Sequence, residues 1–146
     1  PCTAVLGDAA CRVDLSAPEH ALTLPVAGVE DGRLLRLAGT GTQGANWFRR
    51  GRLVVLDGAA AGLSATIKRD SLQGAERLIE LWEPLRAPVL PGNSVTLTSG
   101  CDKRFATCRD KFANLVNFQG FPDLPADGWM LRDPAGSGGL QGGSRR

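Results

Sequence analysis

Apolar and polar residues alternate in six short runs between residues 20 and 99, and turn-forming residues separate the runs. Alternation with a period of two is typical of strands that bury one face, and closely spaced turns are typical of antiparallel sheets. The pattern therefore predicts a mainly β fold, either a small antiparallel barrel or a sandwich. A glycine inside the third run also predicts a β-bulge. The predicted strands are Ala21–Val26, Arg33–Leu37, Phe48–Leu56, Leu63–Arg69, Glu76–Trp82 and Ser94–Thr98.

The two ends of the chain follow a different pattern. Residues 1–19 are rich in turn formers, so we expect an irregular N-terminal segment. After residue 99, Asp102 can cap one short helix over Lys103–Phe112. Residues 133–146 are rich in Gly and Ser, which is typical of a flexible tail. The expected organisation is a β-domain over residues 1–132 followed by this tail.

Composition narrows the classes of function. A chain of 146 residues that is 42% hydrophobic can bury a core, and a net charge of +2 is too small to indicate binding of nucleic acid or an anionic membrane. No apolar run approaches the length of a membrane span. The chain begins on Pro1-Cys2 without a Met, so we expect it to be the C-terminal part of a longer subunit.

Few side chains are candidates for catalysis or ligand binding. The single histidine leaves Glu19, His20 and Asp31 as the nearest acid–base candidates, and they form no recognisable catalytic pattern. We therefore expect no enzyme activity. Three tryptophans could contact a sugar or a partner subunit, but large aromatic side chains are usually buried, so we expect core packing. They are Trp47, Trp82 and Trp129, of which Trp129 is the best candidate for an interface.

Four cysteines form two pairs, with Cys2 and Cys11 before the β-region and Cys101 and Cys108 after it. Eight and six residues separate the members of each pair, whereas structural zinc typically uses ligands two to four residues apart. Disulfides need an oxidising compartment, and an iron–sulfur cluster is held by four thiolates at varied spacing. Spacing alone leaves a cluster, zinc, two disulfides and four unrelated buried thiols open.

Basic residues flank the second cysteine pair. A cluster on four thiolates is negatively charged, and nearby cations would offset that charge, although such residues also occur on any solvated helix face. The residues concerned are Lys103, Arg104, Arg109 and Lys111.

The run CDKRFATCRDKFANLVNFQGFP, from Cys101 to Pro122, resembles the C-terminal signature of a conserved phage protein family found in gene transfer agents and alphaproteobacterial prophages. The opening run CTAVLGDAACRVDL, from Cys2 to Leu15, is similar to the same family. The cysteine pairing also resembles that of the minor tail protein L family of lambda-like phages.

This resemblance implies a baseplate hub protein at the tail tip of a phage or gene transfer agent, assembled in the bacterial cytoplasm. It implies a homotrimer that joins the distal tail protein to a central tail-fibre or receptor-binding protein, without direct nucleic-acid binding. It also implies a [4Fe–4S] cluster that acts as a structural staple, and we expect residues 114–125 to pack over it. A zinc- or disulfide-stabilised interaction domain and a redox-active iron–sulfur protein are the alternatives. The implied ligands are Cys2, Cys11, Cys101 and Cys108.

Overall fold

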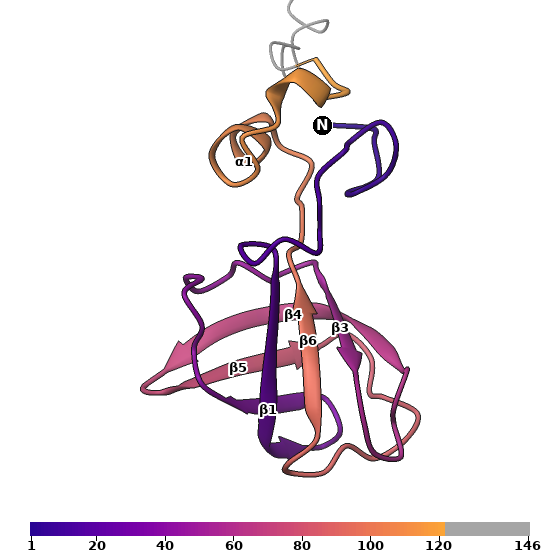
Figure 1. The fold of residues 1–146 in the computed structure, drawn as a ribbon, viewed down its shortest axis with the longest axis vertical. Coiled ribbons are helices and arrows are strands. Elements are labelled where there is room, and N and C mark those ends of the chain that lie inside the picture. The colour runs from indigo at the N-terminus through magenta and orange to yellow at the C-terminus, as the bar shows by residue number, and fades with distance from the viewer. Residues whose placement is uncertain (122–146) are drawn as a thin grey trace, which may run out of the picture.

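Six strands close into an antiparallel barrel in the computed structural model, which describes residues 1–121 (Figure 1). Around the barrel the order is β1-β2-β5-β4-β3-β6, and β6 pairs with β1 to complete the closure. The predicted mainly β fold is confirmed, and of the two predicted architectures the barrel is the correct one. The strands are β1 Ala21–Glu30, β2 Leu34–Ala38, β3 Arg52–Val55, β4 Ser64–Gln73, β5 Glu76–Leu81 and β6 Ser94–Thr98.

The barrel interior is filled by the apolar positions of the alternating runs. In β2, Leu35 and Leu37 are buried while Arg36 between them is exposed. A fully buried Leu or Ile stabilises the fold by about 1.5–3 kcal/mol relative to an exposed one, so these side chains drive closure. The fully or nearly buried core also includes Val26, Phe48, Leu53, Val55, Ile67, Ile79, Leu81, Val95 and Leu97.

Gly51 precedes β3 and does not lie inside the strand, but the predicted bulge is present there. The Arg50 N–H donates to the Ile67 carbonyl and the Ile67 N–H donates to the Gly51 carbonyl, both at 2.9 Å, so two residues oppose one, and Arg50 has a φ of 63°. Residues 48–51 form a turn in which the Gly51 N–H donates to the Phe48 carbonyl at 2.8 Å. Gly51 lies so close to β6 that an added Cβ would sit 1.9 Å from the Thr98 carbonyl oxygen. The strand pairings shift register at Val26–Gly28 in β1 and at Ile67–Arg69 in β4.

The two ends of the barrel carry different structures. Residues 31–33, 56–63 and 82–93 connect strands at one end, which we call the distal end. Beyond the other end, residues 1–19 and 100–121 lie together and form what we call the cysteine module (Figure 1). The helix α1 (Phe105–Asp110) and the 3-10 turn η1 (Leu115–Asn117) belong to this module.

Helix α1 begins later than predicted. Lys103 has a φ of 67°, a left-handed conformation that cannot belong to an α-helix. Asp102 does not cap the helix: its carboxylate accepts the N–H of Arg104 at 3.1 Å and stabilises the turn before it. No helix within residues 1–121 is long and apolar enough to cross a membrane. The predicted tail and Trp129 lie outside the described residues.

Candidate metal centre

The side chains of all four cysteines line one small space in the cysteine module. The space has about 330 Å³ of non-atom volume, part of it open to solvent. The cysteines come from opposite sides of the barrel sequence and are not joined by disulfides. The lining contains no histidine or carboxylate; besides the cysteines it consists of Ala4, Leu6, Val13, Lys103, Arg104, Phe112 and Asn117. Among residues 1–121, no three His, Cys, Asp or Glu side chains form a group that could hold a metal ion.

Asp8 shapes the loop that carries the first pair of cysteines. One carboxylate oxygen accepts the N–H groups of Cys11 at 2.7 Å and Ala10 at 3.0 Å, and the other accepts that of Val5 at 3.0 Å. These backbone donors, that of Cys11 first, lower the pKa of Asp8, so it stays ionised at neutral pH. The turn fixes the position of Cys11 without any regular secondary structure.

Cys101 is positioned by a close backbone approach at the exit from the barrel. An added Cβ on Gly100 would lie 2.0 Å from the Arg49 carbonyl oxygen and 2.3 Å from the Gly51 nitrogen, so only glycine fits there. The left-handed Lys103 then turns its N–H toward the Cys101 sulfur, at 3.3 Å. The Cys101 side chain is thereby held at the end of the barrel.

Backbone hydrogen bonds join the two cysteine-bearing segments directly. The Cys2 N–H donates to the Lys103 carbonyl at 2.8 Å, and the Thr3 N–H donates to the Gln119 carbonyl at 2.9 Å. The Gln119 N–H also points at the Cys2 sulfur, at 3.3 Å. The N-terminal segment therefore lies between the start of α1 and the chain after η1. Residues 114–121 of the segment that we expected to pack over the site do lie beside it. Residues 122–125 of that segment fall outside the described residues.

Asn114 contacts both cysteine pairs and was missed by sequence reasoning. Its side-chain amide donates to the Cys11 carbonyl, and its backbone N–H donates to the Cys108 carbonyl at 3.0 Å. The Cys108 thiol donates to the Asn114 carbonyl at 3.3 Å, and the Asn117 amide holds the Asn114 side chain at 2.7 Å. The only sign of this role in the sequence is that Asn114 is an amide residue between two apolar residues, Ala113 and Leu115.

The surroundings of the Cys108 thiol favour its neutral form. Burial raises the pKa of the Cys108 thiol, and the neighbouring Cys2, Cys101 and Cys11 thiols raise it further. Four thiolates therefore repel one another unless a metal neutralises them, and binding a metal would release protons.

The four basic residues around the second pair play different parts. Lys103 and Arg104 line the space, whereas the Arg109 guanidinium pairs with the neighbouring Asp110 at 2.6 Å. The half-buried Lys111 donates to the carbonyls of Gly100, at 2.7 Å, and Trp47. Burial lowers the pKa of Lys111, and the nearby Cys101 opposes that shift. Lys111 thus ties α1 to the barrel and brings positive charge near Cys101.

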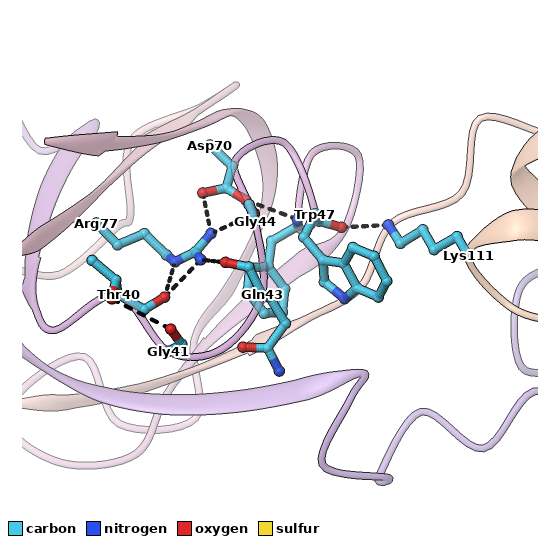
Figure 2. A network of polar contacts seen from close by, with 9 residues as sticks. Thr40, Gly41, Gln43, Gly44, Trp47, Asp70, Arg77 and Lys111 are labelled. Atoms are coloured by element: carbon cyan, nitrogen blue, oxygen red, sulfur yellow. Dashed lines mark hydrogen bonds and ion pairs between the residues drawn. The ribbon is translucent and has the colours of Figure 1, made fainter.

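A buried polar network anchors the loop to which Lys111 binds (Figure 2). The Arg77 guanidinium pairs with Asp70 at 2.6 Å, and both side chains have no solvent exposure. Arg77 also donates to the Thr40 carbonyl at 2.9 and 2.6 Å and to the Gln43 carbonyl. The second Asp70 oxygen accepts the Phe48 N–H at 2.9 Å. The signal that could have revealed this network is a pair of opposite charges at inward-facing strand positions.

The acid–base candidates do not form a catalytic site. His20 immediately precedes β1 and Asp31 immediately follows it, so the ten-residue strand places them roughly 30 Å apart. His20 is buried against Phe112 and Trp47, with ring centroids 5.1 and 6.4 Å away. Burial lowers the pKa of His20, with Glu19 acting in the opposite direction. His20 packs between the barrel and the cysteine module.

The two described tryptophans differ. Trp47 is partly buried, and its indole N–H donates to the Glu19 carbonyl at 2.8 Å, in line with the expected packing role. The prediction for Trp82 is wrong, because Trp82 is 55% exposed at the distal end.

Similarity to known proteins covers nearly the whole chain. Residues 46–127, more than half of the chain, match the family model described as "Phage conserved hypothetical protein BR0599". A chain in the solved structure "Virion of native gene transfer agent (GTA) particle" is 50% identical and aligns over 98% of this chain with a TM-score of 0.81. The present chain spans about half (49%) of the length of that virion chain. No curated protein matches the chain.

Proposed function

The chain belongs to the family described as phage conserved hypothetical protein BR0599, and from this premise we propose that it is a structural subunit of a phage-like particle stapled by an iron–sulfur cluster. The 50% identity to a chain of a gene transfer agent virion supports a place in such a particle. The proposed place is the baseplate hub at the tail tip, which the resemblance of the cysteine motifs supports. There a homotrimer would join the distal tail protein to a central tail-fibre or receptor-binding protein.

The observation that carries the cluster proposal is the convergence of four thiols, from both ends of the barrel sequence, on one space. An all-cysteine donor set suits a [4Fe–4S] cluster, and it also occurs in [2Fe–2S] and structural zinc sites. The N–H groups of Lys103 and Gln119 point at the sulfurs of Cys101 and Cys2, as in hydrogen bonds that tune such clusters. Lys103 lines the space, and its positive charge would offset part of the charge of the cluster, whereas Arg104 is paired with Asp102 at 3.8 Å. The residues present therefore fit this group.

The cysteine module needs a staple because it has little regular structure of its own. Helix α1 has six residues, far fewer than an isolated helix needs to be stable in water. The N-terminal segment is attached to the residues that flank α1 and η1 by a few hydrogen bonds. Metal ligation by all four cysteines would convert binding energy into folding energy for both segments. The bound group supplies crosslinking, and the chain supplies the position of each sulfur.

The staple can be tested with Cys108→Ser, using Thr107→Ser as the neighbouring control that keeps a hydroxyl. We expect Cys108→Ser to leave the barrel folded by circular dichroism but to expose residues 1–19 to proteolysis and to reduce the yield of particles. Thr107→Ser should behave like the wild type. Normal particle yield with Cys108→Ser would contradict the staple, and loss of electron transfer in such particles would favour the redox-active alternative.

A further inference from the structure

The wall of the barrel has an open stretch at the distal end, beside the first residues of β4. Strand β4 has ten residues and β5 has six. The pairing of β4 with β5 covers Ile67 to Gln73, so residues 64–66 pair with β3 and have no strand on their other side. Past Leu81 the chain bends away as residues 82–86, which form the opposite wall of a groove.

Backbone hydrogen-bonding groups of β4 face this groove. The Leu63 carbonyl accepts from Val55 at 2.9 Å, and the Ile67 N–H donates to Gly51 at 2.9 Å, so odd-numbered residues bond toward β3. Because the direction alternates along a strand, Ser64 and Thr66 point their backbone groups into the groove. The Thr66 carbonyl accepts the Trp82 N–H at 3.1 Å, as this alternation requires. The Thr66 N–H and both backbone groups of Ser64 are left for another partner, and such an edge is a template for strand pairing.

Trp82 provides an apolar anchor in the same groove. The groove is open, with a non-atom volume of about 1140 Å³ that includes solvent, and the Trp82 side chain on its wall is 55% exposed. Arg33 donates to the Trp82 carbonyl and Lys68 lies 5.6 Å from the centre of its ring, so the residue is held from both sides. Exposed tryptophans in grooves are frequent hot spots of protein interfaces.

Two arginines and one carboxylate that have no ion-pair partner within residues 1–121 lie at the groove. Arg86 lines it, and Arg52 lies beside it with its guanidinium 2.8 Å from the Ser64 hydroxyl. Neither arginine has an ion-pair partner within residues 1–121. Glu83 is the carboxylate of the lining, and Glu80, which lies outside the lining, is paired with Lys68 at 2.6 Å. This balance complements a segment that carries carboxylates.

We propose that this groove accepts an extended acidic segment of another subunit of the particle, which adds as a strand beside Ser64–Thr66 and packs an apolar side chain on Trp82. The strand would satisfy the free backbone groups of β4, and its carboxylates would meet Arg52 and Arg86. A sugar stacked on Trp82 would leave those backbone groups unpaired, so the open edge favours a peptide. The inference rests on the proposed function, because it takes the partner from the particle.

Hydrogen exchange of the purified particle and of the isolated protein tests the pairing. We expect the amides of Ser64 and Thr66 to exchange about tenfold more slowly, or slower still, in the particle. Equal exchange in the two samples would overturn the proposal. Fluorescence quenching of Trp82 by peptidoglycan fragments, with unchanged amide exchange, would also overturn it and indicate a sugar site.

Two variants test the same groove by incorporation into particles. Ser64→Pro removes a groove-facing N–H without touching the ladder to β3, and Trp82→Ala removes the anchor. Both should fold by circular dichroism and keep the visible spectrum of the wild type, yet enter particles about tenfold less. Val116→Ala, at a side chain that is 97% exposed in the cysteine module, is the control. Wild-type incorporation of both groove variants contradicts the inference, whereas absence of the wild-type chain itself from particles contradicts the proposed function.

Discussion

Replacing Asp70 with Asn tests how much the buried ion pair with Arg77 stabilises the protein. Asp70 neutralises Arg77 at 2.6 Å with no solvent exposure on either side chain. Asn keeps the shape but removes the charge, so the guanidinium stays buried without a counter-ion. Removing one partner of a buried pair costs about 3–5 kcal/mol. That is a large part of the roughly 5–15 kcal/mol that stabilises a typical domain, and it corresponds to a fall in Tm of roughly 10–20 °C.

Urea and thermal unfolding followed by circular dichroism measure this effect. Glu80→Gln is the matched control, because it breaks another 2.6 Å contact, with Lys68, where both side chains are partly exposed to solvent. That substitution should change the unfolding midpoint far less, since solvent screens surface pairs. If Asp70→Asn unfolds within about 1 kcal/mol of the wild type, the inferred role of the buried pair is refuted.

Three further substitutions probe the module itself. Gly100→Ala should destabilise the protein by about 1–3 kcal/mol and lower its metal content, because the added Cβ would lie 2.0 Å from a backbone atom. Gly44→Ala is the control, because there is open space around Gly44 and the substitution should have neither effect. Equal melting curves for the two variants would refute the close-packing argument. Asn114→Ala should weaken metal retention about 10–100-fold in chelator-challenge assays, and unchanged retention would exclude Asn114 as a positioning residue. Burial lowers the pKa of His20, so the unfolded chain binds its proton more readily. Stability should therefore fall as pH drops below about 6.5, and His20→Gln should flatten that slope; an unaltered slope would assign it to other groups.

The strands could be predicted because each carries its own alternation. In β2, the alternation that places Leu35 and Leu37 in the core is enough to predict the strand from its own five residues. The ends of the longer strands could not be predicted: β1 continues to Glu30, past a register shift at Val26–Gly28 that interrupts the alternation. Closure of the barrel supplies partners on both sides of a strand, and those partners extend it beyond its local pattern.

The four cysteines that meet at the candidate site could be picked out from the sequence, whereas the residues that hold them in place could not. Cysteine is rare and chemically distinctive, so two pairs of cysteines on either side of the β-region stand out in the sequence. The supports depend on contacts that exist only after closure, such as the Gly100 approach to Gly51 and the Asn114 bond to Cys11. The left-handed Lys103, which delays α1, has no sequence signal because lysine rarely adopts that conformation.

The central claim, a cluster held by four cysteines, is tested most directly by the metal content of the wild-type protein purified without oxygen. Iron, acid-labile sulfide and zinc should be quantified on the sample that gives the visible spectrum. The proposal predicts a coloured protein with iron and sulfide in equal amounts, at the stoichiometry of one [4Fe–4S] cluster per chain. A colourless protein that contains stoichiometric zinc, or two disulfides and no metal, would contradict it.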